Sequence, residues 1–139
     1  MKIVGTGSCL PQRVVSNDDL AAIMDTSDEW ISSRTGIRNR HIATTETTTS
    51  LACDAVKSAL QDAGIDGSEI DLIIAASVST DKIVPSLACQ IQAEIGAGSA
   101  VAFDINAACS GFLFGLATAD AYFTVSYTHL RAHETELHL

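Results

Sequence analysis

The sequence is poor in aromatic and basic residues. Aromatics make up 5% of the 139 residues, so the hydrophobic core has to be built mainly from alanine, valine, isoleucine and leucine. Lysine and arginine number 8 against 17 acidic residues, which gives a formal net charge of -9. An acidic surface of this kind argues against nucleic acid and against an anionic membrane as general partners.

Paired cysteines and long apolar runs are missing as well. No two of the cysteines have C-x-x-C spacing and no Cys–His zinc spacing occurs; the four are Cys9, Cys53, Cys89 and Cys109. The first residues are typical of a strand rather than of a signal peptide, and no apolar stretch is long enough to span a membrane. We therefore expect free thiols, no metal site and a reducing, cytoplasmic location.

Strand-like and helical segments alternate along the chain. Continuous apolar or extended runs predict strands at 3–8, 37–43, 72–76 and 101–105. Helical spacing, with polar caps before several segments and glycines after them, predicts helices at 16–24, 26–36, 51–63, 85–96 and 109–123. This alternation predicts an α/β layered fold with parallel strands and right-handed crossovers.

Two helix starts carry capping signals. Ser16 with Asp19 resembles a capping box, and Thr26 with Glu29 gives a second one before the helix that carries Trp30.

The helix predicted at 109–123 is apolar on all sides, with few polar positions. Such a helix needs cover, either from more chain or from a partner subunit.

The character of the sequence changes after residue 123. The segment 124–139 contains His129, His133 and His138 and no strand-like run. His129 and His133 are four residues apart, but the H-E-x-x-H pattern of metalloproteases is missing. The segment resembles translated sequencing-adapter read-through, so we predict a domain at 1–123 followed by a non-native tail at 124–139.

Cys109 is the candidate nucleophile. It follows a predicted strand and a turn of small residues, and it is placed at the start of a helix, where unpaired N–H groups and the helix dipole favour a thiolate. The same N–H groups suit the oxyanion formed when a thiolate attacks a thioester. The alternative is that Cys109 is one more small buried hydrophobe.

A local cluster of arginines stands out on this acidic protein. Arg34, Arg38 and Arg40 fall within seven residues that contain no acid. A cationic site of this size suits a phosphate-bearing ligand. A solvated turn with three exposed arginines is the equal alternative.

Five segments carry a family resemblance: IVGTGSCLP at 3–11, DTSDEWI at 25–31, RTGIR at 34–38, PSLACQIQ at 85–92 and AFDINAACSGF at 102–112. Together they make residues 2–123 resemble the amino-terminal half of the β-ketoacyl-acyl-carrier-protein synthase III family. The resemblance implies one thiolase-like αβα half of a duplicated αβαβα fold.

The resemblance also implies an activity and a set of site residues. Members of this family initiate type II fatty-acid synthesis as homodimers, condensing an acyl-CoA with malonyl-acyl-carrier protein through an acyl-cysteine, with no cofactor besides the CoA thioester substrate. On this basis Cys109 takes the acyl group and Trp30 stacks on the CoA adenine, although a tryptophan that caps the core is the alternative. Thr26, Arg34 and Thr35 match positions near the nucleotide end, and Val84 matches a position that shapes the acyl pocket.

The resemblance leaves two functional residues without a counterpart. The His and Asn that drive decarboxylation belong to the second half of the family, so we expect this chain to be a fragment inactive in condensation. The alternatives are a related thiolase-fold CoA acyltransferase, of the hydroxymethylglutaryl-CoA-synthase or secondary-metabolite type, and an inactive CoA-binding fragment. A Cys–His hydrolase using His129 or His133 has no support from chain order.

Overall fold

The structure, a computed structural model, describes residues 2–124 and the backbone of 132–135. Within these residues the chain divides into two compact units. We call Met1–Cys9 together with Thr47–His138 the sheet unit, and Leu10–Glu46 the hairpin unit. Each unit is described by itself.

A three-stranded parallel sheet is the centre of the sheet unit. Its strands are β3 (Leu72–Ala76), β4 (Val101–Ile105) and β5 (Ala132–Thr135), in the order β4-β3-β5. The strands predicted at 72–76 and 101–105 are confirmed, and their parallel pairing sets Leu72 opposite Val101. Four of the five β3 residues are buried, as expected for a central strand covered on both faces.

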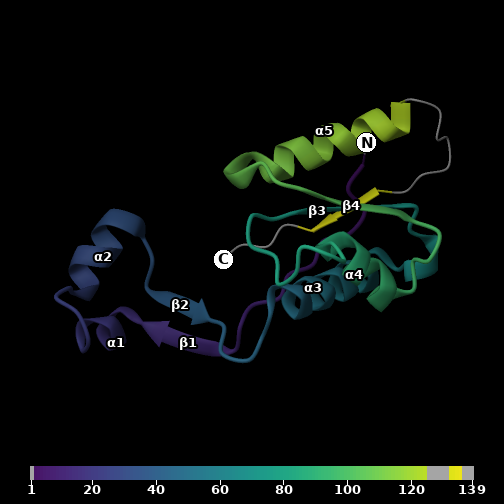
Figure 1. The fold of residues 1–139 in the computed structure, drawn as a ribbon. Helices are drawn as coiled ribbons and strands as arrows, with labels where there is room; N and C mark the ends of the chain where they lie inside the picture. The colour runs from purple at the N-terminus through teal and green to yellow at the C-terminus, as the bar shows by residue number, and fades with distance from the viewer. Residues whose placement is uncertain (1, 125–131, 136–139) are drawn as a thin grey trace. The chain divides into compact units, whose positions relative to one another are not determined.

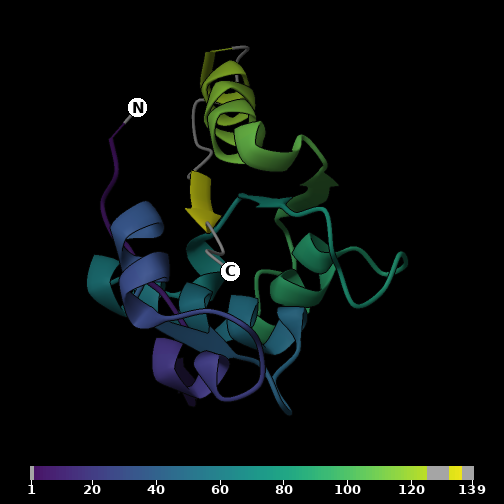
Figure 2. The same cartoon turned by 90° about the vertical axis from the view of Figure 1, so that its left-hand side faces the viewer.

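Helices cover both faces of this sheet (Figures 1 and 2). On one face lie α3 (Thr48–Ala63) and α4 (Leu87–Ile95), and on the other lies α5 (Gly111–Thr124). A short 3-10 helix, η1 (Gly67–Glu69), connects α3 to β3. The predicted glycine stops are confirmed, because both α3 and α4 end at a glycine with positive φ.

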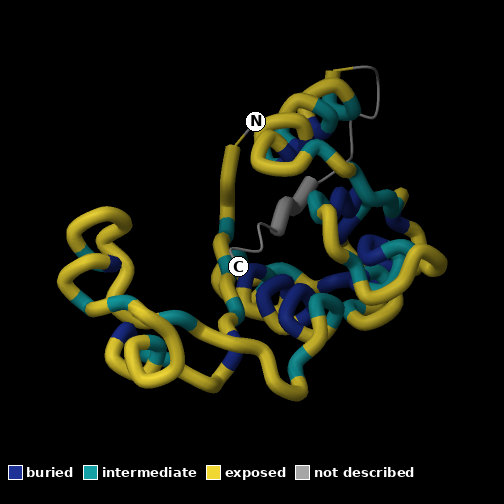
Figure 3. Tube along the Cα trace, turned by 60° about the vertical axis from the view of Figure 1, so that its left-hand side comes forward, coloured by how far each residue is buried: buried dark blue, intermediate teal, exposed yellow. Residues whose placement is uncertain are grey.

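Two apolar clusters fill the spaces between these layers. The larger lies between the sheet and the α3–α4 layer, and its most buried members include Ile70, Leu87 and Ile91, each 1% exposed. The smaller lies under α5 and combines Leu72 and Ile74 with Ala119. Figure 3 shows the buried positions along the helices and strands of this unit. The core is aliphatic, as the shortage of aromatics predicts.

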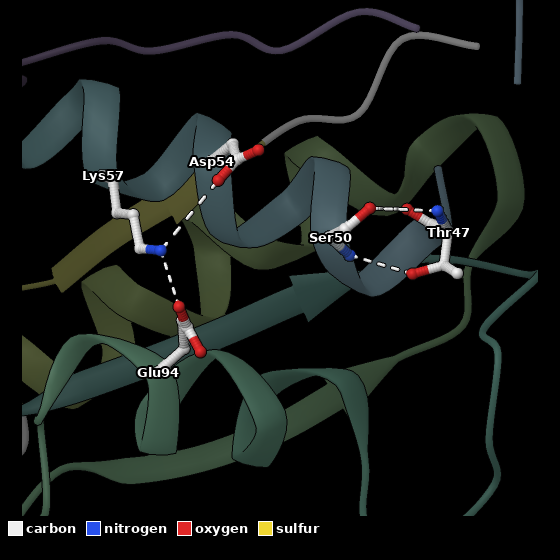
Figure 4. Close-up of polar contacts among 5 residues, drawn as sticks. All are labelled: Thr47, Ser50, Asp54, Lys57 and Glu94. Atoms are coloured by element: carbon white, nitrogen blue, oxygen red, sulfur yellow. Dashed lines mark hydrogen bonds and ion pairs between the residues drawn. The ribbon is translucent and has the colours of Figure 1, made fainter. Parts of the chain in front are cut away.

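Polar contacts hold α3 at its start and against α4 (Figure 4). Thr47 and Ser50 form a reciprocal capping box, in which each side-chain hydroxyl accepts the backbone N–H of the other residue. Lys57 on α3 donates to the Glu94 carboxylate on α4 at 2.6 Å. Both side chains are half exposed, so this ion pair adds little stability compared with the apolar core.

The hairpin unit combines a two-stranded sheet with two short helices. β1 (Arg13–Ser16) pairs antiparallel with β2 (Asn39–Ile42), and α1 (Asn17–Ala21) and α2 (Asp28–Thr35) lie between them in the sequence. The predicted capping box of Ser16 and Asp19 is confirmed at the start of α1. The extended segment predicted at 37–43 is confirmed in β2.

The strand predicted at 3–8 is wrong. Residues 2–9 form no strand, and among the described residues they pair with none of the strands of this unit. The segment packs on α3 instead: a Cβ on Gly5 would stand 2.7 Å from the Ala59 carbonyl oxygen, and the Thr6 N–H donates to Asp62. The two glycines of this segment therefore serve close approach to a helix.

One further expectation differs from the structure. The segment 124–139 has no strand-like run in its sequence, yet Ala132–Thr135 forms β5, parallel to β3. Backbone pairing with a neighbouring strand, rather than alternating hydrophobicity, defines this strand. Among the described residues, no helix combines the length and apolarity needed to cross a bilayer.

Candidate functional site

Cys109 lies beyond the carboxyl ends of the parallel strands. The chain leaves β4 at Ile105 and enters a one-turn 3-10 helix, η2 (Ala108–Ser110), which is closed by a 3.0 Å bond from the Ser110 N–H to the Ala107 carbonyl. α5 follows directly. Ligand sites of α/β folds commonly occupy this edge of the sheet.

The expectation that Cys109 opens the long helix needs a correction. α5 begins at Gly111, two residues later, because the backbone first makes the separate η2 turn. Ala108 has a φ of 45°, in the left-handed region that residues with a Cβ seldom occupy. Strain of this kind is concentrated at functional sites, and here it immediately precedes the candidate nucleophile.

Exposure separates Cys109 from the other three thiols. All four cysteines are free, and Cys109 alone is exposed. Cys53 is buried in α3, and burial, followed by the nearby Glu94 carboxylate, raises the pKa of its thiol. Cys9 and Cys89 are half-buried, and the Cys89 sulfur lies 3.8 Å from the Ala102 carbonyl oxygen. Of the four thiols, that of Cys109 is therefore the most accessible to a large thioester substrate.

Gly111 allows α5 to start close to the end of β3. A Cβ at this position would stand 2.9 Å from the Ala76 Cβ, closer than two carbons pack. Gly111, Gly115 and Ala119 are buried, while Leu113 and Phe114 are 68% and 59% exposed. The three buried small residues of α5 therefore face the sheet. That another chain segment or subunit covers the exposed apolar face stays a prediction.

Val84 lies in the loop between β3 and α4, three residues before α4 begins. Val84 and its neighbour Ile83 are 83% and 94% exposed. The loop is tied back to α3 through Asp81, whose carboxylate accepts the N–H groups of Thr48 and Thr49 at 3.1 and 2.7 Å. These hydrogen bonds lower the pKa of Asp81, that from Thr49 most. Nothing in this arrangement tests the predicted role of Val84 in an acyl pocket.

A second carboxylate fixes the start of α4. Asp104 on β4 accepts the N–H groups of Leu87 and Ala88 at 2.8 and 2.7 Å, and the Ser86 hydroxyl caps the next one. An anion at a helix N-terminus is favoured by the unpaired N–H groups and the helix dipole. Sequence reasoning missed Asp104 and Asp81, because only the tertiary structure brings them to helix starts.

Trp30 and Arg34 form a stacked pair on α2. The Arg34 guanidinium lies 4.6 Å from the centre of the Trp30 ring, as the i, i+4 spacing on a helix permits. Trp30 is 54% exposed, so part of its indole is open to a ligand. A flat aromatic face beside a cation is chemically suited to a base next to a phosphate.

The two threonines near this pair differ in what they contact. Ser27, and not Thr26, caps α2, because the helix begins at Asp28 and the Ser27 hydroxyl accepts the Trp30 N–H at 3.1 Å. This corrects the capping expectation for Thr26, which is half-buried just before the helix. The Thr35 hydroxyl donates to the Ile31 carbonyl at 2.8 Å and accepts the Ile37 N–H.

The three clustered arginines are not equivalent. Arg34 and Arg38 are exposed, whereas Arg40 is half-buried and donates to the Asn17 side chain at 2.8 Å. The cation available to a ligand is therefore carried by Arg34 and Arg38, and Arg40 is part of the internal structure. The sequence left open a phosphate site and a solvated turn of three exposed arginines. The structure has two exposed arginines, which suit either interpretation, and a third that is hydrogen-bonded to Asn17.

The candidate residues are divided between the two units. Thr26, Trp30, Arg34 and Thr35 belong to the hairpin unit, and Cys109 and Val84 to the sheet unit. His129 and His138 lie outside the described residues, and only the backbone of His133 is described, in β5. Within the described part of the chain, no cluster of His, Cys, Asp or Glu residues has the arrangement of a metal site.

Comparison with known proteins shows that the chain is similar to part of one group of enzymes. No protein-family model matches the chain. The chain is 53% identical over 121 residues to the β-ketoacyl-acyl-carrier-protein synthase III of Streptococcus sanguinis, covering 87% of this chain and 37% of that protein. The chain is homologous to β-ketoacyl-acyl-carrier-protein synthase III. It spans little more than a third of the curated synthases that it matches.

Solved structures give the same result for the fold. The crystal structure of the synthase III from Aquifex aeolicus matches with a TM-score of 0.85 and 50% identity, over 88% of this chain and 40% of that one. The priming β-ketosynthase of the R1128 polyketide pathway matches with a TM-score of 0.82 and 38% identity, over 94% and 39%. The predicted thiolase-like α/β fold is thereby confirmed.

Proposed function

We propose that this chain is the acyl-accepting part of a β-ketoacyl-acyl-carrier-protein synthase III, with Cys109 as the residue that carries the acyl group. The observation that carries the proposal is the position of Cys109. It is the exposed thiol of the four, in a strained turn between β4 and α5, within a segment about half identical to named synthases.

The first half of the reaction uses groups that this chain supplies. The Cys109 thiolate attacks the thioester carbonyl of an acyl-CoA, forming a new carbon–sulfur bond and a tetrahedral oxyanion. Collapse of this intermediate breaks the bond to the CoA sulfur, and the CoA thiolate leaves and takes up a proton. Backbone N–H groups of the turn and of the first residues of α5 are suited to the transient oxyanion.

We assign the other predicted residues to the CoA end of the substrate. The exposed Trp30 face receives the adenine, and Arg34 contacts a phosphate, with Thr26 and Thr35 nearby. Val84 contributes to selection of the acyl group. Malonyl-acyl-carrier protein is the second substrate of the complete enzyme, which we propose is a homodimer. Four free thiols fit a cytoplasmic location.

A priming ketosynthase of secondary metabolism is the second candidate. The R1128 enzyme resembles this chain in structure at 38% identity, against 50% for the Aquifex synthase III, so fatty-acid initiation is favoured. The two functions differ in the acyl-CoA that loads Cys109. Competition between acetyl-CoA and longer acyl-CoA thioesters for the thiol distinguishes them.

Covalent labelling tests the proposal directly. In the complete synthase that contains these residues, radiolabelled acetyl-CoA should acylate Cys109, and Cys109→Ala should abolish the label. Cys9→Ala is the matched control and should keep it. Peptide mass spectrometry that finds the acyl group on Cys9, Cys53 or Cys89 would refute the assignment. The 139-residue chain by itself should show no condensation with malonyl-acyl-carrier protein.

A further inference from the structure

The hairpin unit has almost no apolar core. Its only buried residues are Pro11, Asn17 and Ile31, and Ile31 is the single buried residue of α2. Helices in proteins owe most of their stability to the burial of an apolar face. One isoleucine defines neither the rotation nor the tilt of an eight-residue helix, so other contacts have to fix α2.

Asn17 supplies those contacts. It is 1% exposed and takes part in four hydrogen bonds to groups remote in the sequence. Its side-chain amide donates to Asp28 Oδ1 at 2.8 Å and to the Ile37 carbonyl at 2.7 Å. Its side-chain carbonyl accepts from Arg40 at 2.8 Å, and its backbone N–H donates to the Arg38 carbonyl at 3.2 Å.

These bonds hold α2 at both ends. Asp28 is the first residue of the helix, and Ile37 directly follows Gly36, which ends it with a φ of 72°. Trp30 and Arg34 lie between the two anchor points, on the exposed part of α2. A hydrogen-bond network centred on a buried side chain favours one geometry, because other arrangements leave the buried Asn17 amide unpaired.

We infer that Asn17 is the positioning residue for the Trp30–Arg34 pair, setting the orientation of α2 and so the surface offered to a nucleotide. The role of that surface in binding CoA rests on the proposed function; the anchoring of α2 does not. Asn17 itself does not touch the ligand. It acts through Asp28 and Ile37.

The side-chain amide is required because it both donates and accepts. In Asn17→Asp the two donors are lost, the introduced carboxylate faces the Asp28 carboxylate, and the Ile37 carbonyl has no partner. The substitution therefore removes the two hydrogen bonds that tie Asn17 to the ends of α2. Asn39→Asp is the matched control, because Asn39 is exposed on β2 of the same unit and the change of charge is identical.

The double substitution Asn17→Asp with Asp28→Asn tests the geometry. It reverses the polarity of the 17–28 hydrogen bond, so that the new amide donates to the new carboxylate, and Arg40 gains a charged acceptor. The Ile37 carbonyl stays unpaired. This variant should therefore recover part, but not all, of what Asn17→Asp loses.

Hydrogen exchange on the complete 139-residue chain measures the anchoring without any ligand. Asn17→Asp should speed exchange of the amides in 28–35 by roughly fivefold to thirtyfold, the factor that corresponds to one or two kcal/mol. Exchange in 72–76 of the sheet unit serves as the internal reference for intact folding. Asn39→Asp should match the unsubstituted chain in both segments.

Trp30 fluorescence gives the functional readout, because Trp30 is the only tryptophan. Its anisotropy should fall in Asn17→Asp and recover partly in the double variant. Titration with CoA should quench Trp30 in the unsubstituted chain, with a Kd raised at least about tenfold in Asn17→Asp, since one lost anchoring bond is worth a factor of this size. Asn39→Asp should leave the Kd unchanged.

The outcomes separate this inference from the proposed function. Unchanged exchange in 28–35, or loss of protection in 72–76 as well, would overturn a local anchoring role for Asn17. Equal CoA affinity in Asn17→Asp despite a loosened α2 would overturn its positioning role. A chain that never binds CoA would count against the proposed function, while the exchange data would still decide the anchoring.

Discussion

The two units of this chain are stabilised by different means. The sheet unit has apolar clusters on both faces of a parallel sheet, with helices that bury aliphatic residues. The hairpin unit buries three residues and is held by hydrogen bonds that converge on Asn17 and Glu46. The candidate nucleophile belongs to the first unit and the candidate CoA-binding residues to the second.

This contrast teaches that placement of a site does not require a large core. Apolar burial is non-directional and tolerates small shifts, so it makes the sheet unit robust. Hydrogen bonds are directional, so a few of them fix a short helix, but each one matters more. Local opening should therefore be easier in the hairpin unit than in the sheet unit.

The largest expected effect comes from the core of the sheet unit. Ile91→Ala removes a side chain that is 1% exposed between α4 and the sheet, and it should cost about 2–5 kcal/mol of unfolding free energy. Ile83→Ala is the matched control, since Ile83 is 94% exposed. Urea unfolding followed by circular dichroism measures both. Equal losses would contradict the burial described for α4.

An intermediate effect is expected where α5 meets β3. Gly111→Ala places a Cβ 2.9 Å from that of Ala76 and should destabilise the chain by about 1–3 kcal/mol. Gly98→Ala enters open space and should be close to neutral. The comparison uses the same unfolding assay. If Gly111→Ala were as harmless as the control, the close approach of α5 to β3 would be wrong.

The smallest effect is a pH dependence confined to the hairpin unit. The backbone N–H of Gln12 first, then those of Thr44, of Glu46 itself and of Thr45, lower the pKa of the Glu46 carboxyl to about 2. A depressed pKa stabilises the fold above the unfolded value near 4.5, and this contribution is lost as the pH falls towards 2.

Carboxyl NMR of Glu46 should therefore titrate near pH 2. Exchange of the Gln12 and Thr44 amides should speed up as the carboxylate takes up its proton. Glu46→Ala should expose the same amides already at neutral pH and remove the pH response. A titration midpoint near the ordinary value of 4.5 would show that these N–H groups do not converge on this side chain.

Much of the site was predictable from local pattern, and its exceptions have physical causes. The run from Ala102 to Phe112 indicated a strand, a small-residue turn and a helix, and the structure has all three. The separate η2 turn before Gly111 was not predictable, because it depends on the left-handed Ala108 and on the approach of α5 to Ala76. The local pattern could not decide whether Thr26 or Ser27 caps α2, because Ser and Thr are both good capping residues.

The amino-acid sequence by itself determined the central strands and the helix stops at Gly64 and Gly96, since these depend on residues close in the chain. Only the tertiary structure decided that residues 3–8 lie against α3 instead of forming a strand, that Asp104 anchors α4 and that Asn17 is buried. Those outcomes depend on which distant backbone groups come within hydrogen-bond distance, and residues close in the chain do not determine that.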